Sequence, residues 1–432
     1  MNRRTMLALL AGSAASAAFG LSACSSGSSS PSSAGGATTG PLTFWSWNDM
    51  SGPVDAWNAK NPDTPVTFQK LPSRPEYFSK LSAATGAGSG APDVVQIDYN
   101  NLTFSAVEKL IRDVSSETGA INDQFDDAAW AQVRLAGGVY GVPQDIAPLV
   151  LYYRKDLFDQ HGVAVPTTWD EYRTAARTLK VARPESYISS FASNGAAWMM
   201  GLGWQNGAQW FKTADNAWQV DCDDQASLQV ADYWQSMIDE QLVKGDQNWQ
   251  PAWFKGLADG TYLTWIGPSW GTAALKTNAP DLSGKWAIAA LPQWKAGDAK
   301  PSYWGGSALA VTQASSNVGA AMKFISWVNT SAESAELLNQ ELGIYLASKA
   351  GSQIPAFSTP DPYFGGQKLN DVYTTAGSPT PWTWGPTETD TEAQLNDGLQ
   401  QVLNGAQKLP QVFSSVETKT KESLKNKGLA VA

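Results

Sequence analysis

The residues best suited to binding chemistry in this sequence are tryptophans that lie beside turn-forming residues. The chain has 20 tryptophans in 432 residues. Trp47 is at an expected strand end, Trp270 follows a Gly-Pro-Ser turn and Trp304 precedes two glycines. Trp382 and Trp384 lie between prolines, so we expect them outside the core. A flat indole packs against the C–H face of a pyranose while polar side chains bind its hydroxyl groups. These tryptophans therefore indicate an aromatic groove for a carbohydrate.

Other tryptophans occur at helical positions with apolar neighbours, and these are expected in the core: Trp130, Trp169, Trp234 and Trp327. For the tryptophans beside turns the alternative is partial exposure without function, because tryptophan is often incompletely buried.

The scarcity of histidine and cysteine excludes most hydrolytic mechanisms. His161 is the only histidine, so multi-histidine metal sites are excluded, and its place before Gly162 is typical of a helix end. Apart from Cys24, near the start of the chain, Cys222 is the only cysteine, which excludes an intramolecular disulfide in the folded body and a cysteine metal cluster. We expect no catalytic residue, no cofactor and no metal site.

The net charge is −10, and it becomes −12 if the first 23 residues, which include Arg3 and Arg4, are removed as an export signal. This charge opposes binding to nucleic acid or to an anionic membrane. An uncharged or cationic small solute suits the chain better.

The first 23 residues have the pattern of an export signal. Arg3 and Arg4 precede an apolar stretch over residues 6–21, and small residues precede Cys24. The end of this segment, including Cys24, resembles a bacterial lipobox, which implies lipidation of Cys24 and anchoring to the cell membrane. The alternative is that Cys24 is an ordinary small residue in a signal peptide. The paired arginines also resemble a twin-arginine signal, and the export route stays open. Residues 24–41 are rich in Ser and Gly and predict a flexible tether.

From residue 42 the sequence alternates short β-rich runs with helical segments. Strands are expected at 42–46, 66–71, 94–98, 149–153, 286–291 and 303–312, and helices at 53–61, 76–85, 101–111, 168–179, 226–242, 317–328, 333–342, 391–403 and 412–425. This alternation predicts an α/β fold of parallel, doubly wound units, and the length favours two domains.

Several segments, in order along the chain, resemble family 1 extracellular solute-binding proteins of bacterial ABC importers. Residues 140–158 and 166–171 carry the strongest likeness, and 92–96, 254–256, 266–270 and 303–307 agree with it. The resemblance implies a two-lobed periplasmic-binding-protein-like fold, on the plan of maltose-binding protein, with doubly wound sheets joined by crossover hinge strands. Lobe 1 would comprise residues 42–145 and 306–354, and lobe 2 residues 146–305 and 355–432.

The resemblance also implies a function and a set of ligand contacts. The protein would be a monomer that captures a carbohydrate between its lobes and delivers it to the permease of an ABC importer. The implied contacts are Trp47, Asn48, Asp49, Asp98, Tyr99, Gln144, Asp145, Trp270, Trp304, Gly305, Gly306, Trp382 and Trp384, with Glu76, Tyr77 and residues 194–198 as weaker additions. For Asp49, Asp98 and Asp145 the alternative is helix capping or a hinge salt bridge.

Two other functions are compatible with the sequence. The same receptor fold could bind a phosphorylated polyol or a peptide-like solute, although the implied contact segments contain no basic cluster. A surface glycoside hydrolase is the second alternative, because two carboxylates suffice for glycosidic cleavage.

Overall fold

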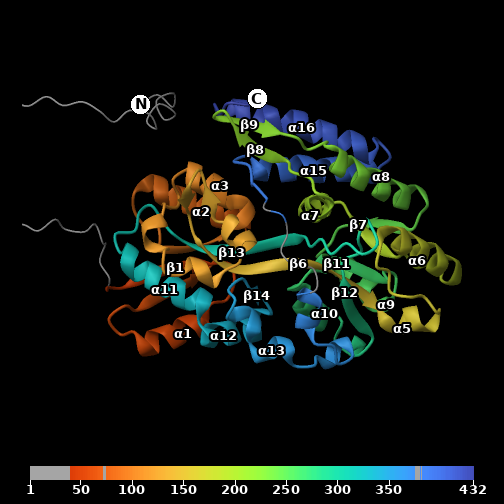
Figure 1. Ribbon diagram of the computed structural model, residues 1–432, viewed down its shortest axis with the longest axis horizontal. Coiled ribbons are helices and arrows are strands. Elements are labelled where there is room, and N and C mark those ends of the chain that lie inside the picture. Colours follow the sequence, from red (N-terminus) through yellow and green to blue (C-terminus); the bar gives the residue numbers. More distant parts are fainter. Residues whose placement is uncertain (1–38, 72–73, 375–379, 381) are drawn as a thin grey trace, which may run out of the picture.

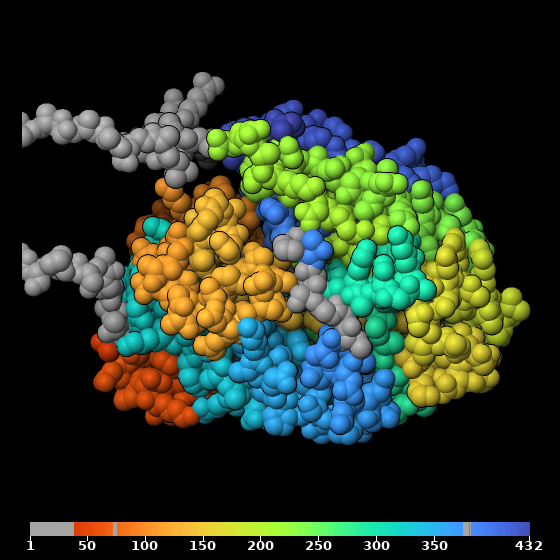
Figure 2. All heavy atoms as spheres, in the orientation of Figure 1, coloured from red at the N-terminus to blue at the C-terminus, as the bar shows by residue number. Residues whose placement is uncertain are grey.

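The computed structural model describes residues 39–71, 74–374, 380 and 382–432, and its core is one eight-stranded sheet. The expected leader, Cys24 and most of the tether lie outside the described residues. Helices α2, α3, α7 and α15 lie on one side of the central strands in Figure 1, and α1, α10, α12 and α13 lie on the other. In the space-filling view most red and orange residues lie at the left of the molecule and most yellow residues at the right, with cyan and blue residues between and around them (Figure 2).

The strands are β1 (Leu42–Ser46), β2 (Val66–Lys70), β3 (Val94–Asp98), β4 (Arg134–Leu135), β5 (Gly138–Val139), β6 (Val142–Arg154), β7 (Ser189–Ala192), β8 (Phe211–Ala214), β9 (Ala217–Val220), β10 (Val243–Asp246), β11 (Thr264–Pro268), β12 (Trp286–Ala290), β13 (Tyr303–Val311) and β14 (Tyr345–Leu346). The helices are α1 (Ser51–Lys60), α2 (Arg74–Ala87), α3 (Tyr99–Val107), α4 (Asp127–Ala131), α5 (Lys155–Gln160), α6 (Trp169–Ala182), α7 (Ala196–Asn206), α8 (Gln225–Asp239), α9 (Pro251–Asp259), α10 (Gly271–Asn278), α11 (Val318–Thr330), α12 (Ala332–Leu342), α13 (Pro355–Ser358), α14 (Leu369–Tyr373), α15 (Glu388–Leu403) and α16 (Leu409–Asn426).

The first lobe is built on the parallel strands β1, β2 and β3. Strand β1 pairs with both of the others, and α1 and α11 pack against it through a cluster of aromatic side chains. Phe324 of α11 makes edge contacts with Phe44 and Trp57, with ring centroids 5.5 Å apart in each pair. Burial of these rings holds the helices against the sheet.

The second lobe is built on β11 and β12, which pair with the far half of β6, and on the separate parallel pair β7 and β10. Thr168 caps the N-terminus of α6 in a complete capping box with Glu171, and Asp224 caps α8 by accepting from the Ser227 N–H at 2.7 Å. Trp169 and Trp234 are buried, as expected, and so is Trp130 in α4; Trp327 is half-buried.

The crossover strands β6 and β13 join the lobes. All 13 residues of β6 are buried; its first half pairs with β13 and β14, and its second half with β11 and β12. The strand pattern alone predicts only residues 149–153, because Pro143 and Pro148 interrupt it, whereas the family resemblance implies a crossover near these prolines. The structure accommodates these prolines beside β13, where the β6–β13 register shifts twice.

Three further details differ from the sequence prediction. The crossover strands are antiparallel to their neighbours, and among the described strands the parallel pairs are β1–β2, β1–β3 and β7–β10. Helix α3 ends at Val107, not at residue 111, because Lys109 adopts a left-handed conformation with φ of 57°. The hairpin β8–β9 is not predicted; Asp215 and Asn216, both with positive φ, form its two-residue turn. Within the described part of the chain, no helix combines the length and hydropathy needed to span a bilayer.

Alanine substitutions at Gly305 and Gly306 should separate the cost of a positive φ from the cost of a steric clash at the new Cβ. Gly305 and Gly306 have φ of 86° and 98°, but only at Gly306 would a Cβ meet close neighbours, Tyr99 Cε2 at 2.7 Å and the Asp145 carbonyl oxygen at 2.9 Å. We expect Gly305→Ala to lower the free energy of unfolding by about 1 kcal/mol and Gly306→Ala by about 3 kcal/mol. Urea unfolding measures both values, and equal losses would contradict the crowding at Gly306.

Candidate functional site

Strand register places two carboxylates on either side of one hydroxyl group at the crossover. Ser307 of β13 pairs with Asp98 of β3 on one side and with Asp145 of β6 on the other. The Ser307 hydroxyl donates to Asp145 Oδ1 at 2.5 Å. All three side chains are buried in the protein, yet all three line the same cavity. The row Asp98–Ser307–Asp145 therefore forms a polar floor.

Burial raises the pKa of Asp145 to about 6; the Ser307 hydrogen bond opposes this shift, and the negative charge of Asp98 adds to it. Asp98 occupies the N-cap position of α3 without a side-chain capping bond, so capping does not explain it. A ligand that donates hydrogen bonds would stabilise these carboxylates in their charged form.

A layer of buried amides and hydroxyls supports the floor. Gln96 Nε2 donates to Gln144 Oε1 and to the Ser307 hydroxyl, both at 2.9 Å, and Ser46 donates to Gln96 Oε1 at 2.5 Å. The Tyr77 hydroxyl donates to the Gln96 carbonyl at 2.9 Å. This network fixes the side chains beneath the cavity.

Four half-buried tryptophans form the walls. Trp47, at the end of β1, packs edge-on against Tyr77 with centroids 5.3 Å apart. Trp270 is the N-cap residue of α10, and its ring stacks on that of Trp249 with centroids 5.3 Å apart and an interplanar angle of 28°. The ring centroid of Trp304, in β13, lies 6.2 Å from that of Trp249 and 6.4 Å from that of Trp270.

Floor and walls enclose a cavity of ≈ 500 Å³, which we call the cleft cavity. Its lining comes from strand ends, from the crossover strands and from α10 and the end of α12. The lining residues are Trp47, Asn48, Gln96, Asp98, Asp145, Trp249, Trp270, Ala273, Ala274, Trp304, Gly305, Gly306, Ser307, Leu342 and Ile344. The structure thus brings together eight of the predicted contacts: Trp47, Asn48, Asp98, Asp145, Trp270, Trp304, Gly305 and Gly306.

Three other predicted contacts, Tyr99, Trp382 and Trp384, line a neighbouring cavity of only ≈ 20 Å³. This space admits about one water molecule. Our expectation that both of these tryptophans lie outside the core is wrong for Trp382, which is 3% exposed and packs on Trp204 at 5.2 Å. Trp384 is half-buried and donates to Gln132 at 2.7 Å. Prolines exclude regular structure here, but the large indole still gains by burial under α7.

The last two predicted contacts do not line the cleft cavity. Gln144 lies beneath it in the amide layer. Asp49 is exposed and accepts hydrogen bonds from the Ser51 hydroxyl and from the Ser51 N–H, the latter at 3.2 Å. It also pairs with Lys70 at 3.6 Å, and these interactions hold its pKa below the ordinary value. Ligand contact by these two residues stays a prediction.

The weaker additions have other positions. Glu76 is exposed, Tyr77 and Trp198 are buried, and Asn194 bonds to a neighbouring loop.

Sequence reasoning missed Trp249, Gln96 and Ser307. Trp249 carries the same signal as the predicted tryptophans, since a proline follows two residues later. Gln96 and Ser307 are placed by strand pairing, which the sequence alone does not reveal.

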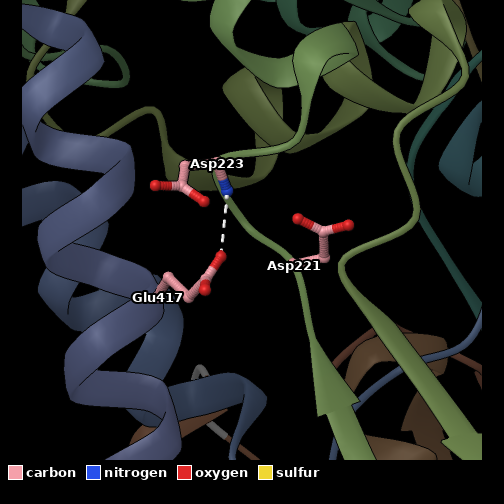
Figure 3. A group of neighbouring side chains, drawn as sticks. All are labelled: Asp221, Asp223 and Glu417. Atoms are coloured by element: carbon pink, nitrogen blue, oxygen red, sulfur yellow. Dashed lines mark hydrogen bonds between the residues drawn. The ribbon is translucent and has the colours of Figure 1, made fainter.

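Outside the cleft cavity, the carboxylates of Asp221, Asp223 and Glu417 lie together (Figure 3), with one oxygen atom of each within 4.8 Å of the others. Glu417 accepts from the Asp223 N–H and from Lys421, and Asp223 accepts from the Ser414 hydroxyl at 2.6 Å. Hydrogen bonds account for the positions of Asp223 and Glu417, and Asp221 is exposed, so we assign no metal ion to this cluster.

Two α/β lobes that share crossover strands and border a polar, aromatic cavity define the class of two-lobed solute-binding proteins. The chain belongs to the bacterial extracellular solute-binding protein family, whose model matches residues 46–335. The family and its named relatives are binding proteins and not enzymes.

Curated relatives and a solved structure agree with this assignment. The chain is 27% identical to an arabinooligosaccharide-binding protein of Halalkalibacterium halodurans over 319 residues, 70% of each chain, and 27% identical to a lactose-binding protein of Rhizobium radiobacter over 359 residues, 77% of this chain and 81% of that one. The galacto-N-biose-/lacto-N-biose I-binding protein of the ABC transporter from Bifidobacterium longum, solved with lacto-N-biose, matches with a TM-score of 0.82 and 26% identity over 91% of this chain and 99% of that one.

The raised pKa of Asp145 predicts a pH-dependent stability. Between the ordinary pKa of 3.8 and about 6 the folded protein holds a proton on Asp145 that the unfolded chain releases. The free energy of unfolding therefore falls as the pH rises from 4 through about 6, by up to about 3 kcal/mol from this group. We expect Asp145→Asn, which keeps an acceptor for Ser307, to remove that part of the slope in urea unfolding between pH 4 and 7. Superimposable pH profiles for the two proteins would contradict the assignment.

Proposed function

We propose that this protein is an extracytoplasmic receptor that captures a carbohydrate, most naturally an oligosaccharide, in the cleft cavity and delivers it to the permease of an ABC importer. The observation that carries the proposal is the cleft cavity itself, where four half-buried indoles surround a floor of two carboxylates and a hydroxyl. Indoles supply apolar contact to sugar rings, and carboxylates accept from sugar hydroxyls.

The charge of the lining favours a sugar over a phosphorylated solute. None of the described residues that line the cleft cavity is Lys, Arg or His. A phosphate ester would meet two carboxylates and no cation, which is unfavourable in a partly desolvated site. The named ligands of the relatives, arabinooligosaccharides, lactose and lacto-N-biose, support the same choice.

Ligand capture in this proposal involves a hinge motion of two lobes, residues 42–145 with 306–354 and residues 146–305 with 355–432. The two lobes also contact each other through α3 and α15, away from the crossover strands. Asn100 Nδ2 donates to Glu392 Oε1 at 2.6 Å, and the Thr389 hydroxyl donates to Asn101 Oδ1 at 3.1 Å. Contacts of this kind, made only when the lobes are close, would be strengthened by a ligand that touches both lobes.

The proposal places the receptor on the outer face of the cell membrane through a lipid on Cys24. Residues 24–41 then separate the folded lobes from the bilayer. A relative from Streptococcus pneumoniae is named as a solute-binding lipoprotein, which supports this arrangement.

Saccharide binding can be tested by a thermal-shift screen of the purified protein against mono- and oligosaccharides. A ligand at 100 times its Kd adds about 2.7 kcal/mol to the free energy of unfolding and raises the Tm. We expect Trp47→Ala to weaken binding of the active saccharide about tenfold, measured by calorimetry. Trp218→Ala, which removes a half-buried indole from β9, is the matched control and should bind normally. No shift with any saccharide, or release of cleaved product, would refute the receptor function.

The anchor can be tested in cells by fractionation. We expect the wild-type protein to partition with the membrane and Cys24→Ala to lose both lipid labelling and membrane association, because the remaining signal cannot be acylated. Membrane retention of the Cys24→Ala protein, with its leader removed, would contradict a lipid anchor at this residue.

A further inference from the structure

Trp249 is the one tryptophan of the cleft cavity that the sequence resemblance does not point to. Resting on the proposed function, we infer that Trp249 is a ligand-contacting residue and that Asn194 is the positioning residue that holds it in the cavity wall.

The ring of Trp249 belongs to the wall and not to the core. It lines the cleft cavity and is half-buried, whereas the neighbouring Trp253 and Trp265 are almost completely buried. It stacks on Trp270 at 5.3 Å and meets Trp304 at 6.2 Å. Three indoles from three separate chain segments thus form one continuous aromatic surface.

The backbone of Trp249 is held in an unfavourable conformation. Its φ is 72°, in the left-handed region that large side chains rarely adopt. The chain must turn from the end of β10, at Asp246, into α9, at Pro251, within four residues. Such strain persists only where neighbouring groups impose it, and it is concentrated at functional sites.

Asn194 supplies that constraint. Strands β7 and β10 are parallel, so their carboxyl ends bring Asn194 beside Asn248. Asn194 Nδ2 donates to the Asn248 carbonyl at 3.1 Å, and the Asn248 N–H donates to Asn194 Oδ1 at 3.0 Å. These two hydrogen bonds fix the N–H and the carbonyl of Asn248, the residue before Trp249.

A second contact holds the same loop from below. Asn248 is 4% exposed, and its Oδ1 accepts from the Ser190 hydroxyl at 3.2 Å. The Ser190 hydroxyl in turn accepts from Trp253 Nε1 at 2.9 Å. Asn194 is itself exposed and does not line the cleft cavity, so its replacement leaves the cavity surface chemically unchanged. Any effect of Asn194 on binding must therefore act through the loop.

The chain offers a matched control for Asn194. In the first lobe, Asn58 of α1 makes the same pair of bonds to a backbone: its Nδ2 donates to the Val66 carbonyl at 2.9 Å, and the Val66 N–H donates to its Oδ1 at 2.7 Å. Asn58→Ala thus removes equivalent bonds away from the cleft cavity.

The test uses the full protein and the saccharide that gives the largest thermal shift. We expect Trp249→Ala to weaken binding about tenfold and Trp249→Phe less, since phenylalanine keeps an aromatic face. Asn194→Ala should weaken binding several-fold, while Asn58→Ala should lower stability without changing affinity. Near-UV circular dichroism should lose the signal of the stacked Trp249–Trp270 pair in Asn194→Ala, as in Trp249→Ala, but not in Asn58→Ala.

The outcomes separate the two levels of the argument. If the wild type binds no saccharide, the proposed function fails, and the inference fails with it. If the wild type binds and the Trp249 and Asn194 variants bind equally well, the inference alone is overturned. Equal loss of affinity in Asn194→Ala and Asn58→Ala would show a general stability effect and would also overturn the positioning role.

Discussion

The pairing of β13 with both β3 and β6 is the constraint on which the cleft cavity depends. Because Ser307 is opposite Asp98 on one strand and Asp145 on the other, the register itself brings the two carboxylates into one row. A one-residue slip of β13 would turn Ser307 to the opposite face of the sheet and remove its hydroxyl from between the two carboxylates. Strands β6 and β13 also connect the lobes, so the strands that join the two lobes form part of the floor of the site.

The distribution of tryptophan follows from this arrangement. Trp169, Trp210, Trp234, Trp253 and Trp286 are fully buried and stabilise the second lobe by burial of apolar area. The four indoles of the cleft cavity remain half-exposed, although an exposed indole face is unfavourable in water. Trp249, Trp270 and Trp304 pack on one another and Trp47 packs on Tyr77, which reduces that cost in the absence of ligand and restricts the ring planes.

The strand pattern indicates contacts near the ends of β1 and β3, and the family resemblance adds contacts in the crossover strands, but neither reveals every residue that pairing and packing bring to the cavity. Trp47 and Asp98 follow recognisable strands, and the carboxyl ends of parallel strands meet at one edge of a sheet. Ser307 could not be assigned a role because the antiparallel register of β13 is a tertiary property. Trp382 was misjudged because proline excludes helix and strand but does not exclude burial.

Electrostatics then selects among ligands. Two buried carboxylates, one with a pKa raised to about 6 by burial, line the cleft cavity, and among the described residues no basic side chain lines it with them. An anionic ligand 4 Å from one carboxylate would be opposed by about 4 kcal/mol at an effective dielectric constant of 20. A hydroxyl donor instead contributes about 1.5–3 kcal/mol through a charge-assisted hydrogen bond. A polyhydroxylated, uncharged ring flanked by indoles therefore satisfies the floor and the walls of the cavity together, which neither a phosphate ester nor a purely apolar ligand does.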